Sequence, residues 1–301
     1  MKIAALNPNG LLRAPSYDVQ GRAALVTGAG QGIGREVVRI LSERGASIVA
    51  VDIDEAAAQE VATEFGDRVL AMGADVSDRA AMVRAVEAAV ERFGRLDIVV
   101  ANAAMMAGKA TIRTMVAEDF DRVLAVNLTG VFNTVRPALR HVVDNGGHVV
   151  VVSSCAAFGP GPSNAAYFTS KAGVEAFGRT LGVELAAVGA SAGVAYFGVV
   201  DTAMAHQALD ADEFARGAAA MLPWPLDARA TAQEAAKSIA DGIARRAVRT
   251  YSPARWELLG LVRGVANVAI DRWFARDRRM HELIRGVECD PMDRAPRGLT
   301  R

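Results

Sequence analysis

Tyr167 and Lys171 lie four positions apart in the stretch NAAYFTSKAG, so a helix would place both side chains on one face. A phenol with a pKa near ~10 is a poor base at neutral pH, but an ammonium one helical turn away favours the phenolate and lowers that pKa. A phenol activated in this way can take the proton of an alcohol while a hydride leaves its carbon. Because the same spacing also occurs on solvated helix surfaces, the interpretation depends on the rest of the chain.

A glycine-rich turn, TGAGQGIG, follows an apolar run near the start of the chain and opens a helical segment. Unpaired N–H groups at a helix N-terminus attract phosphate, and glycine lets the backbone approach it closely. Because the turn opens a βαβ unit, it predicts a dinucleotide site rather than a turn alone. The residues expected to contact the dinucleotide are Gly28, Gln31, Gly32, Ile33 and Gly34.

Asp52 ends the second apolar run, where an acid can accept both hydroxyls of the adenosine ribose and would repel a 2′-phosphate. Ile53 is expected at the same site, and no arginine lies beside it to neutralise a phosphate. We therefore expect NAD rather than NADP, with Asp75 and Val76 beside the adenine. The alternatives are a helix N-cap for Asp52, a role that Asp54 could fill instead, and an ordinary loop carboxylate for Asp75.

Short β-branched runs alternate with longer segments of helical periodicity over the first 200 residues. We expect strands at 23–28, 47–52, 68–75, 96–104, 147–154, 192–198 and 249–253. We expect helices at 32–45, 54–65, 78–93, 117–143 and 165–188. Near-continuous apolar strands, each followed by a helix, predict an α/β fold, a doubly wound Rossmann-type parallel sheet of about seven strands with helices on both faces. The expected organisation is an N-terminal extension (1–20), a Rossmann-type catalytic domain (21–255) and a helical, basic C-terminal appendage (256–301).

Six motifs now stand in one order along the chain: Gly28, Gly32 and Gly34 in TGAGQGIG, NAA at 102–104, Asn127, Ser154, Tyr167 and Lys171. Together they resemble the short-chain dehydrogenase/reductase family in its single-domain branch, over roughly residues 22 to 204. The resemblance implies an NAD(P)-dependent oxidoreductase that assembles as a homodimer or homotetramer.

The catalytic residues implied by the resemblance are Asn127, Ser154, Tyr167 and Lys171. Tyr167 would be the general acid/base, and Lys171 would also hold the nicotinamide ribose. Ser154 would donate to the substrate oxygen, and Asn127 would hold a water that passes protons to solvent.

Further cofactor contacts are also implied by the resemblance. Asn102, followed by Ala103, would hold the central strand near the adenine ribose. Gly198 and Val200 would lie beside the nicotinamide, and Thr202 would contact its carboxamide.

The chain departs from the family pattern at two places near this site. It has NAAM where the family has NAG, and Phe197-Gly198 where the family has Pro-Gly. Gly198 preserves a close backbone approach, whereas Phe197 adds an apolar ring where proline normally fixes the chain.

Members of the family close over substrate with the segment that corresponds to 203–232, which is apolar here. The residues that make it so are Met204, Phe214, Met221, Leu222, Trp224 and Leu226, with Met105, Met106, Phe158 and Phe168 elsewhere. They indicate a hydrophobic substrate such as a terpenoid, steroid, aryl or lipid-like secondary alcohol, unless they only anchor the loop. The expected substrate pocket consists of Ser154, Phe158, Tyr167, Met204 and His206.

Overall composition limits the alternatives. The chain has 301 residues, a formal net charge of zero, and Cys155 and Cys289 as its only cysteines. Nothing in that balance indicates nucleic acid, the histidine spacing predicts no metal site, and Cys155 is expected to be a packed thiol. Neither a signal peptide nor an apolar run of membrane-spanning length is evident, so a cytoplasmic protein is expected.

The segment from 245 to 301 carries thirteen arginines against seven acidic residues. It is expected to be a helical appendage packed on the domain or across a subunit interface. The alternative is a basic amphipathic segment at 256–285 that touches a membrane surface. In that case the apolar contacts would be Trp256, Leu259, Trp273 and Phe274.

The leading hypothesis is an NAD-dependent enzyme that interconverts a secondary alcohol and a ketone on a bulky apolar substrate. A sibling chemistry, NADPH-dependent carbonyl reduction or dihydrodiol oxidation, is the first alternative. A non-catalytic NAD sensor and a membrane-associated scaffold are alternatives of other classes.

Overall fold

The computed structural model describes residues 17–209, 216–217 and 226–289. A seven-stranded, wholly parallel sheet in the order β3-β2-β1-β4-β5-β6-β9 forms its centre. Its strands are β1 (Ala23–Thr27), β2 (Ser47–Asp52), β3 (Val69–Gly73), β4 (Ile98–Ala101), β5 (His148–Val152), β6 (Ser191–Phe197) and β9 (Arg249–Ser252). A separate short pair consists of β7 (Val200–Asp201) and β8 (Ala230–Thr231). The predicted fold class is confirmed.

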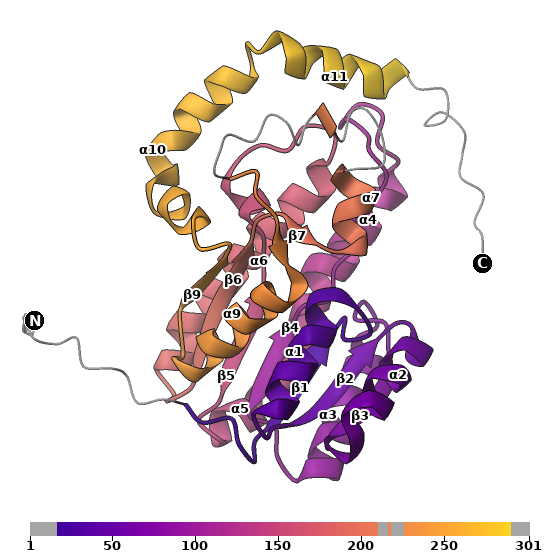
Figure 1. The fold of residues 1–301 in the computed structure, drawn as a ribbon, viewed down its shortest axis with the longest axis vertical. Coiled ribbons are helices and arrows are strands. Elements are labelled where there is room, and N and C mark those ends of the chain that lie inside the picture. Colours follow the sequence, from indigo (N-terminus) through magenta and orange to yellow (C-terminus); the bar gives the residue numbers. More distant parts are fainter. Residues whose placement is uncertain (1–16, 210–215, 218–225, 290–301) are drawn as a thin grey trace, which may run out of the picture.

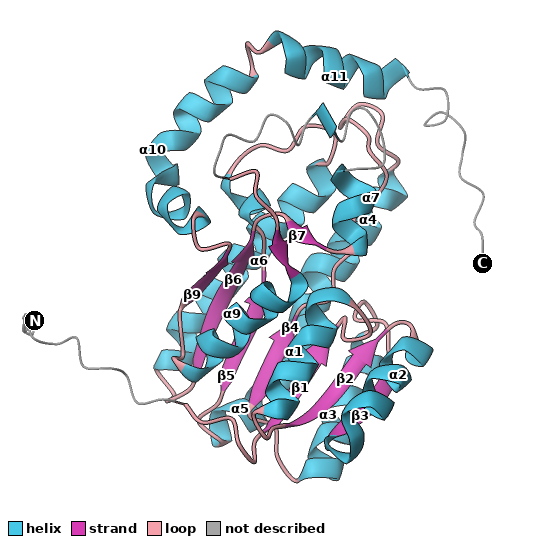
Figure 2. Cartoon of the chain, in the orientation of Figure 1, coloured by secondary structure: helices cyan, strands magenta, loops and turns pink. Residues whose placement is uncertain are grey.

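Helices cover both faces of the sheet, because the strands are buried on both sides and each face must pack against apolar side chains (Figure 2). One layer contains α1 (Gly32–Glu43), α2 (Glu55–Phe65) and α9 (Ala232–Ala244). The other contains α3 (Arg79–Phe93), α5 (Gly130–Asp144) and α6 (Ala165–Ala186).

The long helix expected at 117–143 is present, but it is not regular along its length. It begins as α4 (Ala117–Leu124), passes through a π-helical turn (Ala125–Thr129) and continues as α5. Such turns insert one residue into the helix, and they often occur at functional sites. Short 3₁₀ turns occupy Gly66–Arg68 and Cys155–Phe158.

The C-terminal helices α10 (Trp256–Phe274) and α11 (Arg278–Cys289) arch over the end of the molecule that also holds α4 and α7 (Ala203–Leu209) (Figure 1). Trp256, the first residue of α10, is buried in the same apolar core as β5 and α6. Among the described residues, no helix is long and apolar enough to cross a membrane.

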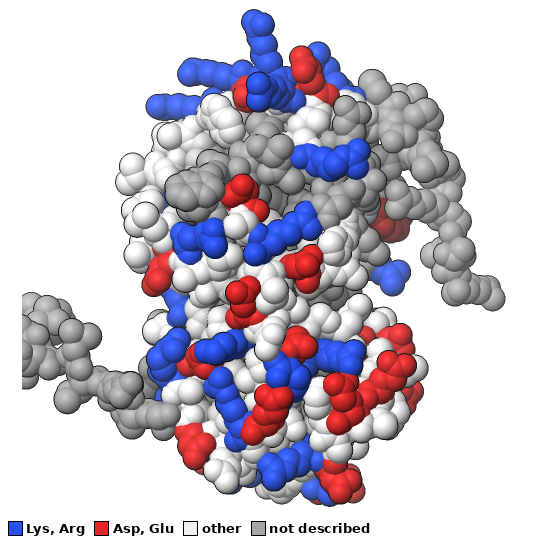
Figure 3. Space-filling view, viewed as in Figure 1, with Lys and Arg blue, Asp and Glu red and all other residues white. Residues whose placement is uncertain are grey.

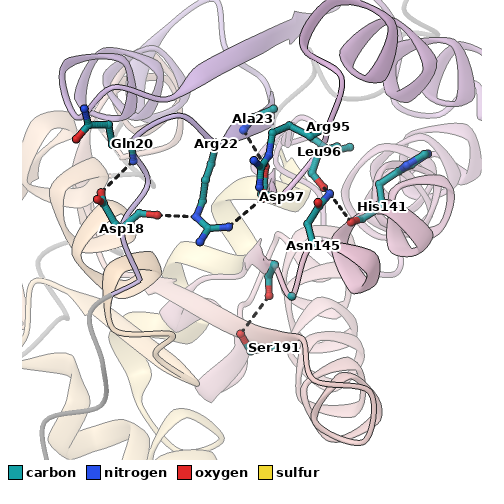
Figure 4. Close-up of polar contacts among 12 residues, drawn as sticks. Asp18, Gln20, Arg22, Ala23, Arg95, Leu96, Asp97, His141, Asn145 and Ser191 are labelled. Atoms are coloured by element: carbon teal, nitrogen blue, oxygen red, sulfur yellow. Dashed lines mark hydrogen bonds and ion pairs between the residues drawn. The ribbon is translucent and has the colours of Figure 1, made fainter.

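At the amino end of β4, the buried carboxylate of Asp97 joins the segment before β4 to the start of β1 (Figure 4). Its Oδ1 accepts from Arg22 Nη1 at 3.0 Å and from Arg95 Nη2 at 2.6 Å, and its Oδ2 accepts from the Ala23 N–H at 3.0 Å. Burial raises the pKa of Asp97, but the hydrogen bonds from Arg95, Ala23 and Arg22 outweigh it and hold the pKa below its usual value.

We predict that Asp97→Asn lowers the free energy of unfolding by about 3 kcal/mol, because it leaves two guanidinium groups facing a neutral amide. A carboxylate whose folded-state pKa is depressed stabilises the fold above its unfolded-state pKa and loses this effect as the pH falls through the folded-state pKa. The wild type should therefore lose stability below about pH 4 more steeply than the variant. Denaturant unfolding at several pH values measures both effects.

Asp144→Asn on α5 is the control, because that carboxylate is 66% exposed and 3.9 Å from its nearest arginine. Its unfolding free energy should change by less than about 0.5 kcal/mol. Equal losses in the two variants would contradict the role assigned to Asp97.

Candidate active site

A cavity of about 1210 Å³ lies at the carboxyl edge of the parallel sheet. Because the strands all end at this edge, it collects side chains that are far apart in the sequence. Most of the residues expected at the site line this cavity: Gly28, Gln31, Gly32, Ile33, Asp52, Ile53, Asp75, Val76, Asn102, Ala103, Ser154, Phe158, Tyr167, Lys171, Gly198, Val200, Thr202 and Met204. Gly34, Asn127 and His206 lie outside its lining.

The glycine turn is held against the end of β4 by close backbone packing. Gly28 has φ +64°, and a Cβ there would lie 2.9 Å from the Cα of Ala103. A Cβ on Gly34 would collide with the carbonyl of Gly28, so this glycine packs beneath the turn instead of facing the cavity. Gln31 precedes α1 without a side-chain hydrogen bond to its first N–H groups, which leaves that helix end able to bind an anion.

Thr27 and Asn102 fasten this turn through four hydrogen bonds. Asn102 Nδ2 donates to the carbonyls of Thr27 and Gly28 at 3.0 and 3.2 Å. Thr27 Oγ1 accepts from the N–H groups of Asn102 and Ala103 at 3.1 and 3.2 Å. Thr27 was not singled out from the sequence, although a hydroxyl at the end of an otherwise apolar strand was a visible signal.

The two aspartates expected near the adenosine have different environments. Asp52 accepts from the N–H groups of Gly30 at 2.8 Å and of Asp54 at 3.1 Å, while Asp54 itself caps α2. Asp52 is therefore not the cap of that helix. Asp75 accepts from the N–H and the hydroxyl of Ser77 at 2.8 and 2.7 Å, so it stabilises the turn before α3 while also lining the cavity.

Lys171 on α6 is 3% exposed, and its Nζ donates to the carbonyl of Val152 at 3.0 Å. The same Nζ lies 5.6 Å from the ring centroid of Tyr167. Burial disfavours the ammonium and lowers the pKa of Lys171 to about 8. The helix is also fixed at this residue, because Ser153 Oγ donates to the Lys171 carbonyl at 2.7 Å.

The phenol of Tyr167 lies in a buried environment. Burial raises its pKa above the usual value near 10, and a hydrogen bond with Ser154 only partly opposes this effect. The lowered pKa is expected from Lys171 together with a nicotinamide cation, so it stays a prediction for the protein with NAD bound. Ser154 Oγ in addition donates to the Phe197 carbonyl at 3.1 Å and accepts from the Ala156 N–H at 3.1 Å.

Asn127 lies in the π-helical turn and is completely buried. Its Oδ1 accepts from the N–H of Met105 at 2.8 Å, and its Nδ2 donates to the Met105 carbonyl at 2.9 Å and to Ser170 Oγ at 3.1 Å. Ser170 donates in turn to the carbonyl of Tyr167 at 2.7 Å. Asn127 thus connects the loop after β4 to the turn of α6 that carries Tyr167.

The far half of the cavity is apolar and includes the C-terminal helices. Besides Phe158 and Met204, its wall contains Trp256, Leu259, Ile270, Trp273, Phe274 and Met280. The four residues named from the sequence as membrane contacts, Trp256, Leu259, Trp273 and Phe274, all line this cavity, and Trp273 is also 47% exposed.

Trp256 explains why the glycine of the family's Pro-Gly is kept at position 198. A Cβ on Gly198 would collide with the indole of Trp256, so only glycine allows the C-terminal helix to begin against the loop. The ring of Phe197 is buried in the apolar layer that includes α1 and α9.

His206 was expected in the substrate pocket, but it lies outside the cavity wall. Its Nε2 is 2.9 Å from Asp201 Oδ1, and 56% of its side chain is exposed. Four other residues expected to close over substrate, Phe214, Met221, Leu222 and Trp224, lie outside the described residues.

Comparison with known proteins identifies the family of the chain. A family model described as "short chain dehydrogenase" matches residues 22–213. The chain therefore belongs to the short-chain dehydrogenase/reductase family, which confirms the resemblance stated from its motifs.

Individual relatives match over part of the chain. "Probable oxidoreductase EphD" of Mycobacterium tuberculosis is 43% identical over 182 residues, which are 59% of this chain but only 31% of EphD. An uncharacterised NAD-dependent oxidoreductase of the same species is 36% identical over 211 residues, 64% of this chain and 76% of that protein. A short-chain dehydrogenase/reductase from Burkholderia phymatum, solved in complex with NAD, superimposes with a TM-score of 0.72 at 25% identity, over 82% of this chain and 93% of that one.

We predict that Thr27→Val lowers the free energy of unfolding by about 1–3 kcal/mol for each of the two N–H groups that lose their acceptor. Because Thr27 is buried, water cannot replace the lost oxygen. The same change should weaken dinucleotide binding, since the turn is no longer fastened to β4. Thr27→Ser keeps the hydroxyl and should behave nearly as wild type in denaturant unfolding and in calorimetric titration; a serine variant as impaired as the valine variant would contradict this interpretation.

Proposed function

We propose that the protein is an NAD-dependent oxidoreductase that interconverts a secondary alcohol and a ketone on an apolar substrate. The observation that carries this proposal is the placement of Tyr167, Ser154 and Lys171 in the wall of one cavity. That cavity extends from the glycine turn and Asp52 at one end to the apolar faces of α10 and α11 at the other.

The residues of the first half suit a dinucleotide. Gly28 and Gly32 have positive φ, and the N-terminus of α1 can bind a pyrophosphate. Asp52 lies where it can accept the ribose hydroxyls, and Lys171 and Thr202 lie where they can hold the nicotinamide ribose and the carboxamide. When bound, NAD supplies the acceptor or donor of the hydride.

The protein residues supply the proton transfer and the alignment. Tyr167 takes the alcohol proton at its phenolic oxygen during oxidation and returns it during reduction. Ser154 Oγ donates to the substrate oxygen and orients it beside the phenol. Asn127 holds the backbone of Met105 and the turn of α6 in place, and the water expected beside it remains a prediction.

The apolar half of the cavity supports a hydrophobic substrate. Phe158 and Met204 lie on the side of the catalytic domain, and Leu259, Ile270 and Phe274 lie on the side of α10. Such a surface favours a terpenoid, steroid, aryl or lipid-like carbon skeleton because each apolar group removed from water adds to binding.

We predict that Asp52→Asn weakens NAD binding by about 10- to 100-fold, because hydrogen bonds to a carboxylate are stronger than those to an amide. Discrimination against NADP should also fall, since the negative charge that repels a 2′-phosphate is gone. Calorimetric titration with both dinucleotides measures the two effects. Asp54→Asn is the matched control, because asparagine also caps helices well, and equal effects of the two variants would argue against Asp52 as the ribose ligand.

We predict that Tyr167→Phe lowers kcat by about 100- to 10,000-fold, the usual contribution of a positioned acid/base, while NAD binding changes little. The assay follows the absorbance of NADH with NAD or NADP and a set of apolar secondary alcohols. Tyr251→Phe is the control, because Tyr251 stacks on Tyr196 and is absent from the cavity lining. Full activity in Tyr167→Phe would overturn the proposed mechanism. Tight NAD binding without turnover of any alcohol would favour the sensor alternative.

A further inference from the structure

The helix α10 is apolar on two opposite sides. Its inner side, which includes Leu259, Ile270 and Phe274, lines the substrate cavity. Its outer side carries a second stripe that is exposed: Leu258 (69%), Leu261 (66%), Val262 (49%), Val265 (84%) and Val268 (53%). These positions recur at the three- and four-residue spacing that places side chains on one helix face. Contiguous exposed apolar stripes of this kind mark surfaces that contact something other than water.

Arginines surround the C-terminal end of the stripe. The same helix face continues from Val268 into the exposed Arg272, and the exposed Arg276 follows in the turn after α10. Beyond it, α11 exposes Arg278, Arg279 and Arg285, against Glu282 as the exposed acid of that helix. Figure 3 shows basic side chains standing out over α11 at one end of the molecule, beside the mostly uncharged surface over α10.

Ion pairs at both ends of the helical pair hold the stripe toward the outside. Arg263 Nη1 donates to Glu175 Oε2 on α6 at 2.6 Å, and the guanidinium of Arg263 also lies 4.7 Å from the ring centroid of Phe158. At the far end, Glu288 accepts from Thr111 Oγ1 at 2.9 Å and pairs with Arg113. Rotation of α10 to bury its outer stripe would break the contacts of Arg263, and the contacts of Glu288 hold the end of α11.

We propose that the outer face of α10 and the arginines of α11 dock the protein on a membrane surface that contains anionic lipids. The apolar stripe would enter the boundary between headgroups and acyl chains, while the arginines contact the lipid phosphates. A second copy of this chain that paired on this face with its helices parallel would bring two arginine clusters together, whereas anionic lipid phosphates neutralise them. This inference rests on the proposed function. Docking would place the apolar end of the cavity next to the lipid, in which a hydrophobic substrate dissolves.

The test is flotation of the full chain with vesicles of phosphatidylcholine alone or of phosphatidylcholine with phosphatidylglycerol. Wild type should bind the anionic vesicles and much less the neutral ones, and added salt should weaken the binding. Leu261→Asp with Val265→Asp should lower binding at least tenfold. Arg278→Gln with Arg279→Gln should lower it by about fivefold for each charge removed. Val248→Asp is the control. Val248 is 68% exposed and precedes the amino end of β9, whereas α10 follows the carboxyl end of that strand.

The outer-face variants should keep wild-type thermal midpoints and wild-type turnover of a small water-soluble alcohol, so that the outcome is independent of the catalytic proposal. The docking proposal would be overturned if the wild type did not bind anionic vesicles, or if the variants bound them with the affinity of the wild type. A variant that becomes monomeric in light scattering, together with a wild type that does not bind vesicles, would instead assign the face to a second copy. If the wild type binds anionic vesicles but turns over no alcohol, the proposed function is contradicted and the docking proposal is supported.

Discussion

A parallel sheet that is buried on both faces confines polar groups to the two ends of its strands, and the cavity lies where the strands end. Within the sheet the inner strands are hydrogen-bonded to a neighbour on each side, and the side chains between the layers are mostly apolar. At the carboxyl edge the chain must leave the sheet, and there the carbonyl of Val152 and the carboxylate of Asp52 become available to other groups. The placement of Lys171 depends on this constraint, because its buried amine needs an oxygen partner that the strand end provides.

The C-terminal helices also contact residues at the carboxyl edge of the sheet. Trp256 packs against Gly198 directly after β6, and Arg263 pairs with Glu175 on the helix that carries Tyr167. The apolar half of the cavity wall and helix α6 are therefore held by shared contacts. A substitution in α10 can affect the position of Tyr167 through Glu175 without touching Tyr167.

The sequence predicted the sheet, and the residues it singled out for the site mostly lie along one cavity, because both depend on local patterns. Apolar runs marked the strands, and the glycine turn, Ser154, Tyr167 and Lys171 each lie at a strand end or on the expected helix. What it could not predict depends on long-range packing. The inward turn of Trp256 and Phe274 follows from contacts with loops far away in the chain, and an apolar residue on a helix suits a membrane and a cavity equally well. His206 was misplaced for the same reason, since its pairing with Asp201 depends on the local path of the chain after β7.

The state of Tyr167 connects the fold to the proposed chemistry. Burial raises the pKa of its phenol, and Lys171 is itself easier to deprotonate than a solvated lysine. A phenol in that state is a poor base, so the proposed mechanism requires that the bound cation of NAD lower the pKa of Tyr167. Titration of the four tyrosines by carbon-13 NMR, with and without NAD and with Tyr167→Phe to assign the signal, tests this requirement directly. The account predicts a pKa of Tyr167 above the usual value in the protein alone and a clear decrease with NAD; an unchanged pKa on binding would contradict it.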